Sequence, residues 1–136
     1  MRLTKQEYFM ELATIASKRS TCNKLAVWAV LVKDDILIST WYNWSARWEI
    51  SCLDIGCLIS HWWNCIRTIH SEVNCILNAA RIWVSIKWAT MYVTDKPCSS
   101  CSRAIINAWI SKVYYRNHYE WDKSIDLSKY IKVAQM

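Results

Sequence analysis

Glycine is nearly missing from this sequence. One glycine stands against ten tryptophans in 136 residues, where average usage would supply about nine or ten glycines. Trp83 and Trp109 follow apparent helices, where a left-handed cap is expected, and Trp41 and Trp44 bracket the end of a strand. We therefore expect tryptophan to occupy positions whose backbone geometry calls for glycine.

Long apolar runs and export signals are also absent from the sequence. No stretch approaches the ~18 consecutive apolar residues of a membrane span, and the first residues lack the apolar segment of a secretion signal. Seven cysteines, an odd number, favour metal ligation over a disulfide framework in such a chain. We therefore expect a cytoplasmic protein with no membrane partner.

The charge balance is moderately basic. A net charge of +6 suits an anionic partner, and a nucleotide phosphate is a small one. No dense stripe of lysine and arginine interleaved with aromatic residues is present, so the sequence gives no support to a nucleic-acid partner.

Length and periodicity predict a single α/β domain over residues 1–136, in which helices pack on a mixed sheet. Thr4 and Glu7 form a capping box before the first helix, and Thr68 is the expected N-cap of the second. The first helix should present Tyr8, Leu12, Ile15 and Ala16 on one face. The expected helices are 4–19, 68–82, 98–108 and a short one at 126–131; the expected strands are 25–32, 36–42, 89–94 and 112–115, with a long loop at 43–68.

His70, Cys98 and Cys101 form a candidate catalytic zinc site. Imidazole nitrogen and thiolate sulfur are zinc ligands, and three protein ligands leave a fourth tetrahedral position for water. Pro97 suits the first turn of a helix, which would place both cysteines at a helix N-terminus, where the macrodipole favours the thiolate.

Glu72 stands two residues after His70, so at the start of a helix its carboxylate can lie beside the metal without ligating it, as a general base should. The complete pattern H-x-E…P-C-x-x-C is that of zinc nucleobase deaminases. A C-x-x-C pair by itself is equally a redox pair or half of a structural zinc site. A purely structural zinc would leave Glu72 without a role.

A broader resemblance extends the motif. The segments 18–22, 27–34, 39–44, 65–72, 89–94 and 105–110 resemble deoxycytidylate deaminases, and the likeness covers residues 4–119. The departures are tryptophan for the family's glycine at Trp28, Trp41, Trp44, Trp83, Trp88 and Trp109, and Ser71 for the alanine of H-A-E.

The resemblance implies a three-layer α/β/α cytidine deaminase-like fold and the hydrolytic deamination of dCMP to dUMP and ammonia. In that reaction a zinc-bound hydroxide attacks C4 of the base, while Glu72 shuttles protons. The family also implies a homohexamer with dCTP and dTTP, bound with magnesium, as effectors.

Further site residues follow from the resemblance. Asn43 would contact the nucleotide sugar, although a turn residue with unusual backbone angles is an equal interpretation. The other candidates have packing or surface roles as alternatives. The substrate-binding candidates are Asn43, Ser71, Tyr119, Arg67 and Arg19, and the effector-binding candidates are Tyr42 and Asn43.

A second, structural zinc is expected. Four thiolates can close a tetrahedral site, and a zinc clamp would explain the patternless loop that the family resemblance also places there. Free buried cysteines are the alternative. His61 is the substitute ligand if one cysteine is absent, and Cys75 is expected only to pack. The four candidate ligands are Cys22, Cys52, Cys57 and Cys65.

Two other functions remain open at this point. One is a related deaminase that acts on cytidine or on a base in nucleic acid. The other is a non-catalytic, zinc-stabilised assembly or nucleotide-binding module, whose base pocket the indole of Trp28 would help to close.

Overall fold

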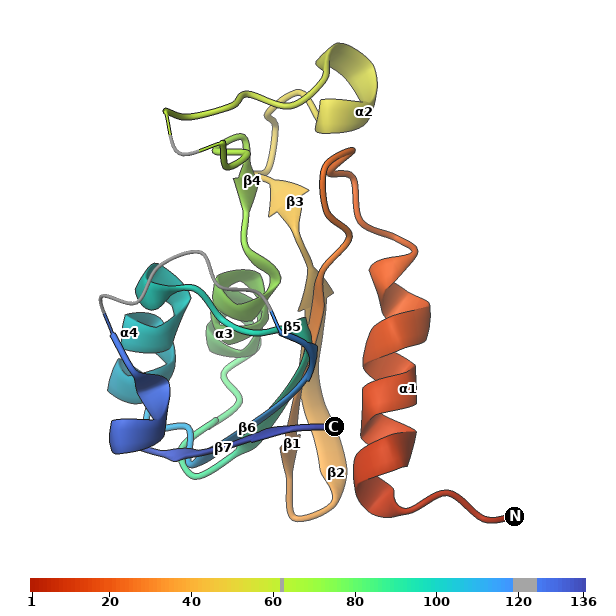
Figure 1. Ribbon diagram of the computed structural model, residues 1–136, viewed down its shortest axis with the longest axis vertical. Helices are drawn as coiled ribbons and strands as arrows, with labels where there is room; N and C mark the ends of the chain where they lie inside the picture. Colours follow the sequence, from red (N-terminus) through yellow and green to blue (C-terminus); the bar gives the residue numbers. More distant parts are fainter. Residues whose placement is uncertain (62, 119–124) are drawn as a thin grey trace.

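A five-stranded mixed sheet divides the molecule into layers (Figure 1). The computed structural model describes residues 1–61, 63–118 and 125–136. The strand order is β2-β1-β5-β6-β7; β1 pairs antiparallel with β2 and β5, whereas β5, β6 and β7 are parallel. The strands are β1 (Trp28–Lys33), β2 (Ile36–Tyr42), β5 (Thr90–Asp95), β6 (Lys112–Asn117) and β7 (Lys132–Gln135).

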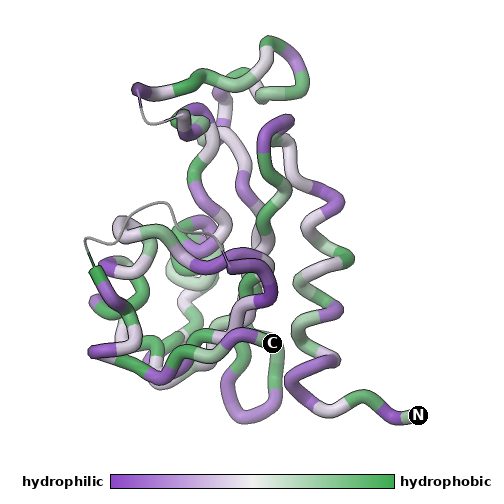
Figure 2. Tube along the Cα trace, in the orientation of Figure 1, coloured by the Kyte–Doolittle hydropathy of each residue, from purple (hydrophilic) through white to green (hydrophobic). Residues whose placement is uncertain are grey.

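Helix α1 (Lys5–Ser17) covers one face of the sheet alone (Figure 1). The expected capping box is present, because the side chains of Thr4 and Glu7 each accept a hydrogen bond from the other residue's backbone N–H. The expected apolar face is wrong in part: Tyr8 and Ile15 are 50% and 62% exposed, whereas Leu12 and Ala16 are partly buried and pack toward the sheet. Apolar and polar residues are mixed along α1, as the colours in Figure 2 show, and apolar residues occur among both its exposed and its buried positions. Periodicity alone therefore does not select the buried side. The side chains of α1 that are buried against the sheet are Phe9, Met10 and Ala13.

Helices α3 (Ser71–Arg81) and α4 (Ser99–Asn107) cover the opposite face (Figure 1). Successive residues of a strand point to opposite faces, so β1 serves both layers. Ala29 and Leu31 face α3 and α4, whereas Val30 and Val32 face α1. Both faces of the central strands are therefore buried, and the expected three-layer α/β/α fold is confirmed.

A small lobe extends beyond the sheet between β2 and α3 (Figure 1). The expectation of a loop over 43–68 is wrong in part, because β3 (Trp44–Ser45), α2 (Cys52–Ile55) and β4 (Thr68–Ile69) lie in this region. Thr68 is not the N-cap of α3: it pairs with Ser45 across β3 and β4, and His70 takes the cap position. Two-residue strands are too short to leave a period in the sequence.

The C-terminal segment differs most from expectation. The short helix expected at 126–131 is a single 3-10 turn, η1 (Leu127–Lys129), and the edge strand β7 that follows was not predicted. A partly exposed edge strand carries no continuous apolar run, so its sequence resembles that of a polar tail. Among the described residues, no helix is long and apolar enough to cross a membrane.

We predict that Leu31→Ala lowers the free energy of unfolding by about 2–5 kcal/mol, because the side chain is fully buried between the sheet and the helices α3 and α4. Denaturant unfolding followed by circular dichroism measures the loss. Leu37→Ala is the matched control; this side chain on β2 is 37% exposed, and its truncation should cost clearly less. Equal losses would contradict the assignment of Leu31 to the core.

Candidate metal centre and active site

Two helix N-termini meet to form the first cluster of metal-binding groups. His70 is the N-cap residue of α3, Cys98 is the N-cap residue of α4, and Cys101 is the third residue of α4. Pro97 precedes the cap and so lies outside the first turn, contrary to expectation. The Nδ1 atom of His70 lies 3.5 Å from the sulfur of Cys98 and 3.3 Å from that of Cys101. The structure therefore brings His70 together with two cysteines that lie 28 and 31 residues further along the chain.

The geometry of this cluster fits a tetrahedral metal ion. Bonds of about 2.0–2.3 Å to nitrogen and sulfur at tetrahedral angles place the ligand atoms about 3.5–3.8 Å apart. The two measured separations in His70, Cys98 and Cys101 are 3.3 and 3.5 Å, and all three ligand atoms lie within 4.8 Å of one another. One imidazole and two thiolates are a zinc donor set that leaves one position open.

The three ligands share protons in the absence of a metal. The pKa of Cys98 is lowered to about 4, first by a hydrogen bond from Cys101 and then by one from His70. The pKa of His70 is raised to about 9 by its hydrogen bond to Cys98, and the pKa of Cys101 is raised by its hydrogen bond to Cys98 and by burial. A divalent cation would replace these protons, so metal binding is expected to release them.

Glu72 lies in the first turn of α3 and is only 4% exposed. Burial raises the pKa of its carboxyl group, because removal from water disfavours the charged form. Ser71, which is fully buried, donates a hydrogen bond of 3.1 Å from its hydroxyl to Oε2 of Glu72. A dry carboxyl group held in one orientation beside a metal site is suited to proton transfer.

A second cluster holds four cysteines in the lobe between β2 and α3 and in the segment that follows α1. The sulfur atoms of Cys22 and Cys57 are 3.7 Å apart, those of Cys52 and Cys65 are 3.5 Å apart, and all four lie within 4.8 Å of one another. Tetrahedral zinc with bonds of about 2.3 Å to sulfur requires separations of about 3.8 Å. The four sulfur atoms thus match a closed structural site, and His61 is not part of the group.

Burial, hydrogen bonds and neighbouring thiols shift the pKa values of Cys22, Cys52 and Cys65 in different directions. The pKa of Cys22 is raised by desolvation. The pKa of Cys65 is lowered to about 6: burial opposes this shift, but hydrogen bonds from the backbone of Thr68 and Arg67 outweigh it. One thiol of the cluster is therefore ready to ionise near neutral pH, which favours metal capture.

Asn43 follows strand β2 directly, and its side-chain amide links several segments of the chain by hydrogen bonds. It is 5% exposed, its Nδ2 donates to the carbonyl of Leu25 at 2.7 Å, and its Oδ1 accepts from the backbone N–H of Val27 at 3.0 Å and from the hydroxyl of Ser20. The amide therefore joins the end of β2 to the segment before β1.

Tyr42 lies within a stack of aromatic rings. Its ring centroid is 4.7 Å from that of Trp28, 5.1 Å from that of Trp44 and 5.4 Å from that of Trp41. Trp28 is itself only 6% exposed. The indole of Trp28 thus fills space in the layer between the sheet and α1, beside Tyr42.

The remaining candidates are dispersed. Nε of Arg67 donates to the carbonyl of Gly56 at 3.1 Å and so belongs to the lobe. Arg19 is exposed just after α1. Tyr119 lies outside the described residues. Cys75 is buried in α3, where its thiol contacts the hydroxyl of Ser39 at 3.6 Å, so the expected packing role is confirmed.

Asn74 is a supporting residue that the sequence did not single out. Its Nδ2 donates to the carbonyl of Tyr42 at 3.1 Å and to that of Ile69 at 3.2 Å. These bonds fix the first turn of α3 against the end of β2. No motif marks this asparagine, because its partners are main-chain atoms.

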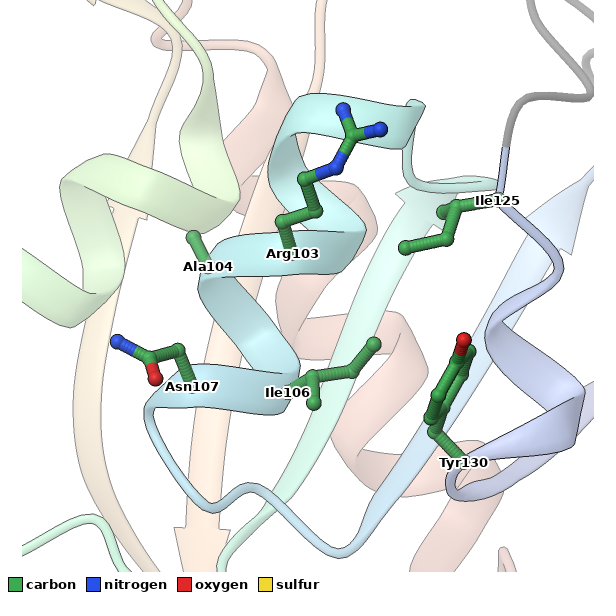
Figure 3. Close-up of a pocket in the computed structure, with 6 residues that line it drawn as sticks. All are labelled: Arg103, Ala104, Ile106, Asn107, Ile125 and Tyr130. Carbon is green, nitrogen blue, oxygen red and sulfur yellow. The ribbon is translucent and has the colours of Figure 1, made fainter.

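Two surface cavities lie apart from the metal cluster. One, of about 550 Å³, lies between α4 and the η1 segment, and Figure 3 shows Arg103, Ile106 and Tyr130 around it. The other, of about 570 Å³, is bordered by Trp41, Trp44 and Trp48 and by polar residues of α3. Neither cavity includes His70 or Glu72 among its lining residues.

The arrangement at the two helix N-termini defines a class of protein that binds one metal ion beside a general acid or base. Comparison with known families specifies the class. The family described as the cytidine and deoxycytidylate deaminase zinc-binding region matches residues 3–117. The chain therefore belongs to the cytidine and deoxycytidylate deaminase family.

Individual relatives agree with this assignment. The chain is 40% identical over 121 residues to ComE operon protein 2 of Bacillus subtilis, covering 88% of this chain and 62% of that protein. It is 36% identical over 129 residues to the deoxycytidylate deaminase of Saccharomyces cerevisiae, covering 90% of this chain and 41% of that protein. The chain thus spans less than two thirds of each of these two relatives.

A solved structure matches the entire fold. The dCMP deaminase from the cyanophage S-TIM5, in complex with dCMP and dUMP, superposes with a TM-score of 0.82 at 25% identity. The match covers 100% of this chain and 99% of that chain. The layered architecture described above is therefore that of a dCMP deaminase.

We predict that Cys52→Ser reduces bound zinc from two ions to one per chain and lowers the melting temperature, because a hydroxyl replaces one of four thiolate ligands in the lobe. Metal analysis of the purified protein and differential scanning calorimetry measure both effects. Cys75→Ala is the control, since Cys75 lies outside both clusters and should leave the zinc content unchanged. An unchanged zinc content in Cys52→Ser would contradict the second site.

Proposed function

We propose that this protein is a zinc-dependent dCMP deaminase that converts dCMP and water to dUMP and ammonia. The observation that carries the proposal is the buried carboxyl of Glu72 beside a His-Cys-Cys donor set at two converging helix N-termini. A purely structural metal site has no use for a buried, unliganded carboxyl group, whose desolvation costs free energy.

His70, Cys98 and Cys101 would hold the catalytic zinc. When bound, zinc lowers the pKa of a water ligand and so makes it nucleophilic near neutral pH. Glu72 accepts the proton that the attacking water loses and delivers it to N3 of the pyrimidine. Glu72 then transfers the second proton to the amino group, which leaves as ammonia, so that water supplies the new carbonyl oxygen at C4.

Ser71 supports this proton transfer by position. Its hydroxyl donates to Oε2 of Glu72 and so helps to hold the carboxyl group in one orientation. The full burial of Ser71 keeps this hydrogen bond out of competition with bulk water.

The choice of dCMP as substrate is supported by relatives. The yeast relative is named deoxycytidylate deaminase, and the cyanophage structure contains dCMP and dUMP. The net charge of +6 is compatible with a nucleotide phosphate. The residues proposed to contact substrate remain Asn43, Ser71, Tyr119, Arg67 and Arg19.

Regulation and assembly form the finer part of the proposal. The cavity of about 570 Å³ is lined by Arg47 and Arg81 together with one carboxylate, Glu49, and it adjoins the aromatic stack around Tyr42. The two guanidinium groups outnumber the carboxylate, which supports an anionic effector there. We include dCTP or dTTP with magnesium as effectors, Tyr42 and Asn43 as effector residues, a homohexamer, and a cytoplasmic location that keeps the seven free thiols reduced. A structural zinc on Cys22, Cys52, Cys57 and Cys65 completes the assignment.

We predict that zinc-loaded protein converts dCMP to dUMP and that Glu72→Gln lowers kcat by at least about 100-fold, since the amide cannot relay protons. Chromatographic separation of the two nucleotides measures the turnover. Asp34→Asn, an equivalent carboxyl-to-amide change in the exposed turn after β1, is the control and should keep full activity. Zinc analysis of both variants must show an unchanged content.

The same assay discriminates the alternatives. If cytidine or deoxycytidine is turned over as fast as dCMP, the protein is a nucleoside deaminase that does not require the phosphate. Two bound zinc ions without turnover would favour the non-catalytic module, which the burial of Trp28 against Tyr42 supports as the second candidate.

A further inference from the structure

Five tryptophans in the described part of the chain have a left-handed backbone. The φ angles are +73° at Trp48, +60° at Trp63, +59° at Trp83, +70° at Trp88 and +60° at Trp109. Residues with a bulky side chain rarely adopt this conformation, because Cβ approaches the following carbonyl oxygen. The two other non-glycine residues with positive φ among the described residues are aspartates in the β1–β2 turn, where that residue type is tolerated.

Trp83 ends α3 in a complete Schellman motif. The backbone N–H of Trp83 donates to the carbonyl of Ala80 at 3.1 Å, and the N–H of Val84 donates to the carbonyl of Ala79 at 3.0 Å. This pair of bonds requires a left-handed residue at the position of Trp83, and glycine usually fills it.

Trp109 ends α4 in the same motif. Its N–H donates to the carbonyl of Ile106 at 3.0 Å, and the N–H of Ile110 donates to the carbonyl of Ile105 at 3.3 Å. Two separate helices thus place tryptophan at the one cap position that favours glycine most strongly.

Trp48 and Trp88 occupy the third position of four-residue turns. The N–H of Glu49 donates to the carbonyl of Ala46, and the N–H of Ala89 donates to the carbonyl of Ile86, each at 3.0 Å. The preceding residues in the two turns do not have positive φ. A positive φ at the third position alone is the signature of a type II turn, which requires glycine or asparagine there.

Trp63 closes a tight turn in the lobe. Its N–H donates to the carbonyl of Ser60 at 3.0 Å, and the N–H of Ser60 donates to the carbonyl of Asn64 at 2.8 Å. A left-handed residue that follows a turn and precedes the returning strand is a glycine position in short hairpins.

Packing of the indole rings does not offset these costs. Trp48, Trp63 and Trp83 are 93%, 77% and 95% exposed. Trp88 and Trp109, which contact each other edge to face at 5.5 Å, are still 59% and 57% exposed. Nζ of Lys87 lies 5.2 Å from the ring centroid of Trp88 and 4.7 Å from that of Trp109, but such a contact at an exposed site contributes less than a left-handed backbone costs at each of the two residues. An exposed side chain also gains little from burial, so the contacts among the described residues do not offset the cost.

We propose that the protein made in its own host carries glycine at positions 48, 63, 83, 88 and 109. A gene codon that the host decodes as glycine, and that another genetic code reads as tryptophan, would produce this substitution at every such position at once. The same reading accounts for one glycine against ten tryptophans in the chain. The proposal rests on backbone geometry and does not depend on the deaminase activity.

The direct test is tandem mass spectrometry of peptides from the protein isolated from the cells that naturally carry the gene. Glycine at the five positions is the expected result. Tryptophan at these positions would overturn the proposal.

A stability series tests the physical basis independently. Three forms of the chain carry glycine, asparagine or alanine at all five positions, for example Trp83→Gly, Trp83→Asn and Trp83→Ala, and each is compared with the chain as written. The unfolding equilibrium should favour the fold in the order glycine, asparagine, alanine, with a factor of about 5–30 per position between the first and the last. Alanine removes the indole but keeps Cβ, so it isolates the backbone requirement.

The outcomes of the series are distinct. A higher melting temperature and folded yield for the glycine form than for the alanine form support the proposal, whether or not the tryptophan chain folds. Equal stability of the glycine and alanine forms, or greatest stability of the tryptophan chain, would overturn it.

Discussion

The convergence of two helix N-termini is the constraint on which the candidate active site depends. His70 caps α3 and Cys98 caps α4, so the positions of the metal-binding atoms are set by how both helices pack on the same face of the sheet. The positive end of the helix dipole at each N-terminus also favours negative charge there. The N-termini of α3 and α4 would therefore stabilise thiolate and carboxylate groups around a bound cation. The buried residues beneath, such as Leu31 and Ile105, keep that convergence in place.

The lobe between β2 and α3 is not stabilised mainly by burial of apolar side chains, unlike the layered core. Many of its apolar side chains are exposed: Leu53 is 65% exposed, Ile55 57% and Ile66 61%. A segment with so little buried apolar surface does not order itself by the hydrophobic effect alone. Four sulfur atoms within 4.8 Å of one another supply the alternative, because a metal ion would add the free energy of coordination to that of folding. The molecule thus combines a conventional layered core with a metal-organised extension.

The sequence predicted the strongly periodic elements well, and the structure brings together the three side chains that the sequence proposes as metal ligands of the active site. Strand β1, which is apolar except for Lys33, and the H-x-E and P-C-x-x-C spacings are local signals that can be read from the sequence alone. The weaker features depend on partners distant in the sequence. Strand β7 exists because β6 offers it an edge, Asn74 is important because of two carbonyl groups, and the buried face of α1 is selected by the sheet. The left-handed positions of Trp83 and Trp109 were predicted because a helix end restricts its own backbone. The backbone of Trp41 and Trp44 is not left-handed, so the same expectation is wrong there, since a regular strand imposes no such restriction.

In both α3 and α4 the metal-binding residues lie at the N-terminus, and the chain reverses its direction at the C-terminus. Helix α3 rises about 1.5 Å per residue over its 11 residues, so its C-terminal turn lies well away from Glu72. The reversals after α3 and α4 adjoin each other, since the N–H of Trp88 donates to the carbonyl of Trp109 at 2.8 Å. Insertions or fused segments at that end would leave the metal-binding groups undisturbed. Sequence changes at the N-termini of α3 and α4 would therefore alter catalysis, whereas insertions at their C-termini would alter only the length of the chain or what is attached to it. This separation suits a domain that occurs in proteins of very different size.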